Sequence, residues 1–243
     1  MNYSFLQCGE GALTVHLGDG IDPAINRRVT ALQGAIGSAG LRGITDLIPA
    51  YADLTVCYDC TVISAKALQR QLRRLLDSLS VAGQDRRRVF RLPVCYGGDY
   101  GPDLDFVCHH SGLSAQEVIE LHSAPDYLIY MLGFLPGFAY LGGLDPRLHT
   151  PRLDSPRTCI PAGSVGIGGA QTGVYPLASP GGWQLLGRTP VSVFDRQRQE
   201  PILYRAGDLV HFVPISPAKY EEIARAVAAG TYTVQVEEVP VCD

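Results

Sequence analysis

The stretch from Met131 to Pro190 contains twelve of the chain's 27 glycines and eight of its 17 prolines, but neither Lys nor Glu. Glycine permits close backbone approaches, whereas proline fixes φ and removes a donor. Disordered segments of this composition are poor in large apolar residues. This stretch carries Phe134, Phe138, Tyr140, Ile160, Val165, Ile167, Val174, Tyr175 and Trp183. We therefore predict a folded, irregular, aromatic-lined surface and take it as the candidate site.

The size and charge of the chain exclude several classes of protein. Its 243 residues suffice for one large domain or two modest ones. The formal net charge is −4, so no basic surplus favours binding to nucleic acid or to an anionic membrane. No apolar run is long enough to cross a bilayer, and the N-terminus lacks the pattern of a signal peptide. We therefore expect a cytoplasmic protein.

Phosphate-loop and metal chemistry have little support in the sequence. The two lysines, Lys66 and Lys219, lie outside the central stretch, and no GxxxxGK[ST] loop occurs. No HExxH motif is present, and the CxxC pair Cys57 and Cys60 has no second pair to complete a zinc site. We expect no metal site. An anion in the central stretch must be held by arginine or by backbone N–H groups.

The N-terminal part alternates strand and helix patterns. Helices are predicted after the capping residues Asp22 and Ser64. Strands are predicted at residues 11–17, 43–49, 53–59 and 89–95. The resulting βαββαβ order is that of a ferredoxin-like domain.

The polar segment 81–88 interrupts these patterns and predicts a domain boundary. We place a ferredoxin-like domain at residues 1–86 and a second domain at 87–243, although the strand at 89–95 could belong to either side. The second part contains several short strands with turn signals and two marginal helices. This pattern favours a small closed or partly closed β-barrel. The predicted fold class is α+β.

Two arginines are the strongest candidates for holding an anion. Arg152 and Arg157 each follow a proline, and guanidinium groups bind carboxylate or phosphate in a bidentate manner. Gln171 and Thr172 occupy a glycine-flanked turn and offer both donors and acceptors.

Two further polar residues have competing interpretations. His122 lies at a predicted helix end and could serve as a general acid or base, or simply be stabilised by the helix dipole. Ser164 lies in AGSVG, which lacks one glycine of a GxSxG nucleophile elbow and is not followed by a helical pattern. A turn or ligand-binding hydroxyl is the better interpretation of Ser164.

The segments EVIELHSAPDYLIYMLGF, MLGFLPGFAYLGGLDPRL and PRTCIPAGSVGIGGAQTGVYPLASPGGWQLLGRTP closely resemble the 5-oxoprolinase B-subunit family. This family is also described as the KipI or allophanate hydrolase subunit 1 group. The resemblance extends to GDGIDPAINRRV and LPVCYGGDYGPDL, so it covers nearly the whole chain. The departures are small: Ala139 where Pro is common, Ile160 where Val is usual, and Gly168-Gly169 in place of a longer Gly-Ile-Ala-Gly segment.

The resemblance implies an N-terminal α/β domain followed by a cyclophilin-like β-barrel. It also implies that the chain works with two partners, a homologous barrel protein (the C subunit) and a third protein (the A subunit). Together they cleave 5-oxo-L-proline to L-glutamate at the expense of ATP, used with Mg²⁺. In fused relatives the active cleft lies between two such barrels, so the central stretch would be one wall of a shared site.

Within this interpretation we assign provisional roles from residue type and loop position. The predicted catalytic residues are Arg157, Gln171 and His122. The predicted substrate-binding residues are Arg152, Gly163, Ser164, Thr172 and Tyr175. The predicted pocket or partner surface comprises Phe134, Pro136, Phe138, Tyr140 and Trp183. Two alternatives stay open: a KipI-like inhibitor that binds a sensor histidine kinase, and a subunit of a urea- or allophanate-processing system.

Overall fold

The computed structural model of the chain describes residues 3–79 and 86–240. The chain divides into two compact units, residues 1–84 and 85–243. Each unit combines a sheet with helices, so the predicted α+β class is confirmed. No helix of the described residues is long and apolar enough to cross a membrane.

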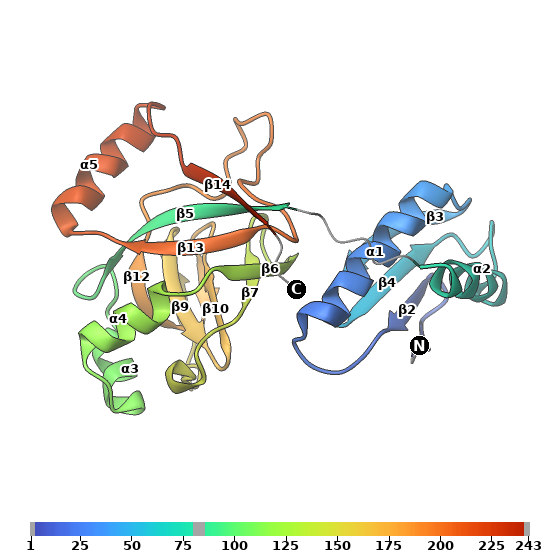
Figure 1. The fold of residues 1–243 in the computed structure, drawn as a ribbon, viewed down its shortest axis with the longest axis horizontal. Helices are drawn as coiled ribbons and strands as arrows, with labels where there is room; N and C mark the ends of the chain where they lie inside the picture. Colours follow the sequence, from blue (N-terminus) through green and yellow to red (C-terminus); the bar gives the residue numbers. More distant parts are fainter. Residues whose placement is uncertain (1–2, 80–85, 241–243) are drawn as a thin grey trace. The chain divides into compact units, whose positions relative to one another are not determined.

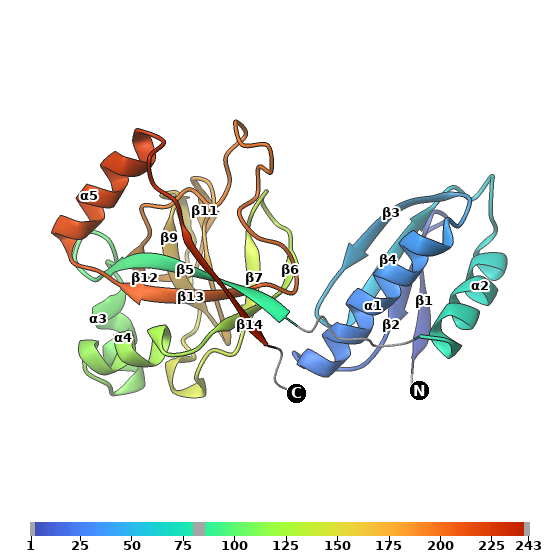
Figure 2. The same ribbon diagram turned by 45° about the horizontal axis from the view of Figure 1, so that its top comes forward.

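In residues 3–79, the N-terminal unit is an antiparallel sheet of strand order β1-β2-β4-β3 with helices α1 and α2 packed on one face (Figures 1 and 2). Its elements are β1 (Ser4–Cys8), β2 (Ala12–His16), α1 (Pro23–Ala39), β3 (Ile44–Pro49), β4 (Asp53–Tyr58) and α2 (Ala65–Asp77). Helix α1 begins after the Asp22 cap and ends at Gly40 in the left-handed conformation. The core joins alternate residues of the two central strands to leucines of both helices, as at Leu13, Leu54, Leu32 and Leu72.

The predicted βαββαβ order of this unit is wrong, because the observed order is ββαββα. Strand β1 was not expected, and it forms a hairpin with β2. The strand expected at 89–95 is part of β5 (Arg86–Tyr96), which pairs within the second unit. A strand pattern shows that a segment is extended and half-buried, but its pairing partners depend on tertiary contacts.

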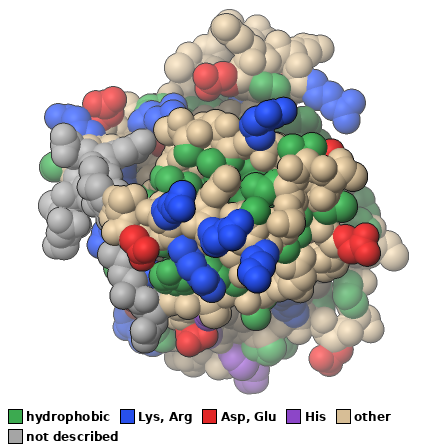
Figure 3. Space-filling model, turned by 90° about the vertical axis from the view of Figure 1, so that its right-hand side faces the viewer, with side chains coloured by type: hydrophobic (Ala, Val, Ile, Leu, Met, Phe, Trp, Pro, Cys, Tyr) green, Lys and Arg blue, Asp and Glu red, His purple; other side chains and the backbone are tan. Residues whose placement is uncertain are grey.

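The outward face of α2 is basic. Arg70, Arg73 and Arg74 are exposed, whereas Leu68 and Leu72 face the core. The guanidinium carbon of Arg73 lies 5.5 Å from the ring centroid of Phe5 on the neighbouring strand. Figure 3 shows basic side chains gathered on the face of the N-terminal unit that carries this helix. This is the solvated side of an amphipathic helix.

Among residues 86–240, seven strands close into a barrel in the order β12-β9-β10-β7-β6-β13-β5, and β5 pairs back onto β12. The strands other than β5 are β6 (Tyr127–Leu132), β7 (Ala139–Gly142), β9 (Ser164–Gly168), β10 (Gln171–Val174), β12 (Gln184–Arg188) and β13 (Leu209–Pro214). The predicted closed β-barrel is therefore confirmed.

Strand β5 closes the barrel by changing partners along its length. One side pairs in parallel with β13. The other side pairs first with β14 (Gln235–Pro240), from Arg86 to Arg91, and then with β12 at Cys95 and Tyr96. Large apolar side chains with no exposed surface, such as Leu92 and Phe212, pack together in the core of this unit.

The remaining elements of this unit lie outside the barrel ring. They are α3 (Leu104–Ser111), α4 (Ala115–Ser123), the 3₁₀ turn η1 (Pro146–Leu148), β8 (Arg157–Ile160), β11 (Ser179–Gly181) and α5 (Pro217–Ala228). Strands β8 and β11 pair as a separate small sheet. This sheet places the loops before and after it next to the candidate site.

Candidate functional site

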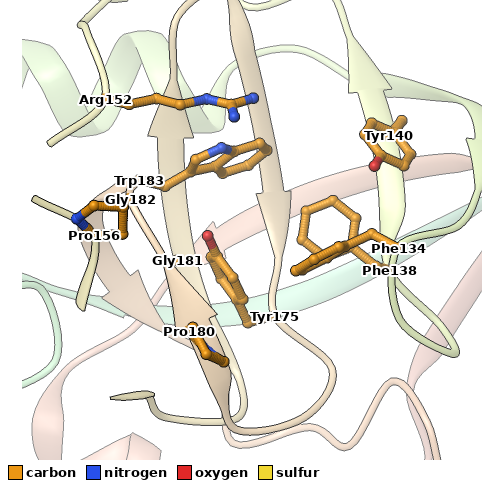
Figure 4. Close-up of a pocket in the computed structure, with 10 residues that line it drawn as sticks. All are labelled: Phe134, Phe138, Tyr140, Arg152, Pro156, Tyr175, Pro180, Gly181, Gly182 and Trp183. Carbon is orange, nitrogen blue, oxygen red and sulfur yellow. The ribbon is translucent and has the colours of Figure 1, made fainter. Parts of the chain in front are cut away.

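An aromatic pocket of about 310 Å³ lies in the central stretch, and Figure 4 shows its lining side chains. Its lining residues are Phe134, Phe138, Tyr140, Arg152, Pro156, Tyr175, Pro180, Gly181, Gly182 and Trp183. They come from the β6–β7 loop, from β7, from the loop before β8, from the segment after β10 and from β11 with its following loop. Arg152 and Trp183 lie on one side, and the rings of Phe134 and Phe138 lie on the other.

Phe138 is the centre of the aromatic cluster that forms this pocket. Its ring centroid lies 5.2 Å from that of Tyr140 and 5.5 Å from those of Phe134, Tyr175 and Trp183. All four pairs are edge-to-face, the arrangement that the aromatic quadrupole favours. Phe138, Tyr175 and Trp183 are buried, so they form a rigid wall.

Two glycines of the stretch make room for these rings. A Cβ at Gly168 would overlap the indole of Trp183, and a Cβ at Gly181 would come within 2.5 Å of the Tyr175 hydroxyl. The glycine content of the stretch therefore has a specific physical cause here, since larger residues cannot lie against the aromatic side chains.

We expect Gly168→Ala to displace the indole of Trp183, since the added methyl group overlaps that ring. The expected cost is about 1–3 kcal/mol of unfolding free energy, as for other overpacked sites. Trp183 is the only tryptophan of the chain, so its emission maximum and its denaturation curve report directly on this site. Gly34→Ala in α1 is the control, because a Cβ there meets nothing within 4 Å. An unchanged emission maximum in the Gly168 variant would contradict the close packing.

Arg152 is the one charged residue among the described residues that line the pocket. Its side chain is exposed and forms no hydrogen bond or ion pair with any other described residue. Its positive charge acts on Tyr175, whose pKa is raised by burial and lowered in part by Arg152. The Tyr175 hydroxyl is therefore protonated at neutral pH, and the pocket offers an anion both a guanidinium group and aromatic walls.

Arg157, predicted to be catalytic, forms an ion pair and a hydrogen bond that connect separate elements of the fold. Its Nη2 lies 2.6 Å from Oδ1 of Asp103, and its Nη1 donates to the Trp183 carbonyl at 3.3 Å. The other oxygen of Asp103 accepts from the backbone N–H of Leu185 at 2.7 Å. Arg157 therefore links β8 to β12 and to the start of α3, and it does not line the pocket.

His122, also predicted to be catalytic, is fully buried in the unit's core and stacks on Phe212. Its Nε2 lies 2.7 Å from the Thr172 hydroxyl, which itself donates to the Gly166 carbonyl. The Thr172 oxygen must then accept from Nε2–H, so Nδ1 is left to accept from the Tyr96 hydroxyl at 2.8 Å. Burial lowers the pKa of His122 to about 3. In this geometry the neutral imidazole is enclosed by the core and does not line the pocket, so the acid–base role of His122 stays a prediction that the geometry does not favour.

The burial of His122 makes the stability of the protein depend on pH. The unfolded chain takes up a proton below the ordinary pKa of 6.5, whereas the folded chain does so only near 3. The free energy of unfolding should therefore fall as the pH decreases from about 6.5 towards 3, by at most about 1.4 kcal/mol per pH unit.

The His122→Gln variant is the matched control for this prediction, because its side chain does not titrate. Urea unfolding followed by Trp183 fluorescence at pH 7, 5.5 and 4.5 should show a shallower pH slope for the variant than for the wild type. Parallel slopes would show that His122 does not account for the acid sensitivity.

The other predicted site residues lie away from the aromatic pocket. Ser164 on β9 and Thr172 on β10 are buried and do not line this pocket, so their substrate-binding role stays a prediction. Gly163 lines a separate cavity of about 190 Å³ that shares Tyr175. Gln171 begins β10 and Pro136 is exposed in the β6–β7 loop, and neither is a lining residue.

Sequence reasoning missed four lining residues, Pro156, Pro180, Gly181 and Gly182. All four belong to the central stretch, and the Pro-Gly-Gly run immediately before Trp183 was the available signal. Within the described residues, no group of His, Cys, Asp or Glu side chains could hold a metal ion.

Residues 3–204 match the family described as "Carboxyltransferase domain, subdomain C and D". The chain is 42% identical over 230 residues to the 5-oxoprolinase B subunit of Bacillus subtilis, covering 90% of this chain and 96% of that protein. It is 46% identical over 207 residues to the Escherichia coli O157:H7 protein of the same name, covering 85% and 93%. The solved urea carboxylase of Kluyveromyces lactis shares the fold, with a TM-score of 0.82, 23% identity and coverage of 98% of this chain and 24% of that one.

Proposed function

The chain belongs to the carboxyltransferase domain, subdomain C and D family, and on that premise we propose that it is the B subunit of an ATP-dependent 5-oxoprolinase. High identity to two proteins named as the B subunit of 5-oxoprolinase, over most of their length, supports this assignment. The name of these relatives also supports a role within a larger complex, in which the A and C subunits supply the rest of the enzyme.

The observation that carries the proposal is a small pocket with aromatic walls and with Arg152, which has no hydrogen-bond or ion-pair partner among residues 3–79 and 86–240. 5-Oxoproline is a five-membered lactam ring that bears one carboxylate. Aromatic faces suit the ring, and a guanidinium group suits the carboxylate. A volume near 310 Å³ is at the lower end for small-molecule sites, which fits a ligand of this size.

The pocket supplies binding groups but not a complete set of reactive groups. Opening a lactam requires an activated carbonyl, and transfer of the ATP γ-phosphoryl group to the amide oxygen is one route. Water then adds to that carbon, the ring nitrogen leaves as the amine, and a second water hydrolyses the acyl phosphate to glutamate and phosphate. None of the lining residues that the structure describes is a carboxylate, imidazole or lysine that could move the protons of these steps. We assign this work to the partner proteins.

ATP does not match the donors of the aromatic pocket. A triphosphate with Mg²⁺ needs several cationic or backbone donors and oxygen ligands for the metal. The lining residues offer one arginine and no carboxylate. We therefore propose that ATP binds to a partner protein and that this chain holds the lactam.

The test is reconstitution of the complex. Co-expression of this chain with the A and C subunits should give glutamate release that depends on both ATP and 5-oxoproline. Omission of this chain should abolish the release. Equal glutamate release without the chain would contradict the proposed function.

A further inference from the structure

Phe134 has a backbone conformation that disfavours its side chain. Its φ is +63°, and among the described residues it is the only non-glycine residue with a positive φ. The N–H of Leu135 donates to the carbonyl of Gly133 at 2.7 Å, which closes a three-residue γ-turn centred on Phe134. Turns of this hand are rare and strained, and a bulky residue in them is a genuine outlier.

Three neighbouring hydrogen bonds hold this turn in place. The N–H of Phe138 donates to the Leu135 carbonyl at 2.9 Å, and the N–H of Gly133 donates to the Phe138 carbonyl at 3.1 Å. The buried Tyr204 hydroxyl donates to the Gly137 carbonyl at 3.0 Å. These hydrogen bonds fix the backbone of the loop and therefore hold Phe134 at its positive φ.

The ring of Phe134 contributes little to the fold that would offset this strain. Its exposed fraction is 65%, and among the described residues its ring contact is the edge-to-face pair with Phe138. A glycine at this position would form the same turn without strain and without an exposed apolar ring. Strained residues of this kind concentrate at ligand sites. The exposed surface of Phe134 thus points to a ligand that covers it.

We propose that Phe134 is a positioning residue for the ligand of the aromatic pocket. Its ring forms the wall across the pocket from Arg152 and Trp183, so a lactam whose carboxylate binds Arg152 lies with its apolar ring against Phe134. The γ-turn presents the phenyl ring before the ligand arrives, which reduces the entropy lost on binding. This proposal rests on the proposed function, because it takes 5-oxoproline as the ligand.

Two substitutions at position 134 distinguish the contribution of the phenyl ring from that of the backbone strain. Phe134→Gly removes both, whereas Phe134→Ala removes the ring but keeps a Cβ at positive φ. In the reconstituted complex both variants should raise the KM for 5-oxoproline about tenfold, because both lose the apolar contact. The Gly variant should have a melting temperature at or above that of the wild type. The Ala variant keeps the strain and loses only an exposed ring, so it should melt close to the wild type and below the Gly variant.

Phe106→Ala is the matched control, because Phe106 is also an exposed phenylalanine but lies on α3, outside the pocket lining. It should leave the KM unchanged. Co-elution of each variant with the A and C subunits is measured in parallel.

The outcomes are distinct. An inactive wild-type complex would contradict both the proposed function and this proposal. An active complex in which Phe134→Gly leaves the KM unchanged would overturn this proposal alone. Loss of co-elution in the Phe134→Gly variant would show that Phe134 contacts a partner protein. A marked fall in the melting temperature of that variant would show that the ring of Phe134 stabilises the fold. Either result overturns the positioning role. A raised KM with intact assembly and undiminished stability supports it.

Discussion

Arg152→Gln should lower kcat/KM for 5-oxoproline about 10- to 100-fold in the reconstituted complex, chiefly through a higher KM. The guanidinium group of Arg152 is the one charge among the described residues that line the pocket. A hydrogen bond to a charged partner is worth about 1.5–3 kcal/mol. The lost interaction exists in the bound ground state as well as in the transition state, so affinity should suffer more than kcat. Initial rates over a range of 5-oxoproline concentrations at saturating ATP measure the effect.

Arg147→Gln is the control for this prediction. Arg147 lies in the same stretch and carries the same charge, but it is paired with Asp145 at 2.7 Å and does not line the pocket. Its replacement should leave the kinetics unchanged. If the two variants behave alike, the carboxylate is held elsewhere and the assignment of Arg152 fails.

Arg157→Ala should lower the free energy of unfolding of the barrel unit by about 2–3 kcal/mol. Its loss leaves Asp103 largely buried without a cation, and breaking one side of a buried pair is costly. The estimate is below the 3–5 kcal/mol of fully buried pairs, because the Arg157 side chain is 30% exposed and partly screened by solvent. Urea unfolding followed by Trp183 fluorescence reports on this unit, since it contains the only tryptophan.

Arg152→Ala provides the matched comparison, because both arginines follow a proline in the same stretch. We expect it to change stability by no more than about 0.5 kcal/mol, as for a surface residue without partners. The two substitutions should therefore have different effects. Replacement of Arg152 should weaken substrate binding, and replacement of Arg157 should lower stability. An Arg157→Ala variant that is as stable as the wild type yet inactive would restore the catalytic role first assigned to Arg157.

The composition of the central stretch was sufficient to predict its aromatic pocket. Phe134, Phe138, Tyr140, Tyr175 and Trp183 were all recognised from sequence, and all five line the pocket. The reason is physical and local. Glycine and proline shape a folded but irregular backbone, and large aromatic side chains among them must pack on one another.

The polar residues of the site were predicted less well, because their roles depend on partners far away in the chain. Arg157 is occupied by Asp103, 54 residues earlier, which no pattern in the stretch reveals. His122 is enclosed by Tyr96 and Thr172, 26 and 50 residues away. Sequence spacing places a polar group on an element, but only the packed structure decides whether that group faces solvent or the core.

The sequence by itself determined the α+β class, the β-barrel and the aromatic character of the Met131–Pro190 stretch, because hydrophobic periodicity and glycine content act over neighbouring residues. Tertiary structure alone decided that β5 joins the barrel, that Arg152 and not Arg157 faces the pocket, and that Phe134 is held in a strained turn beside it. The first two depend on partners far away in the chain, and the turn at Phe134 combines hydrogen bonds within residues 133–138 with one from the distant Tyr204. The arrangement of the site is therefore a property of the folded chain.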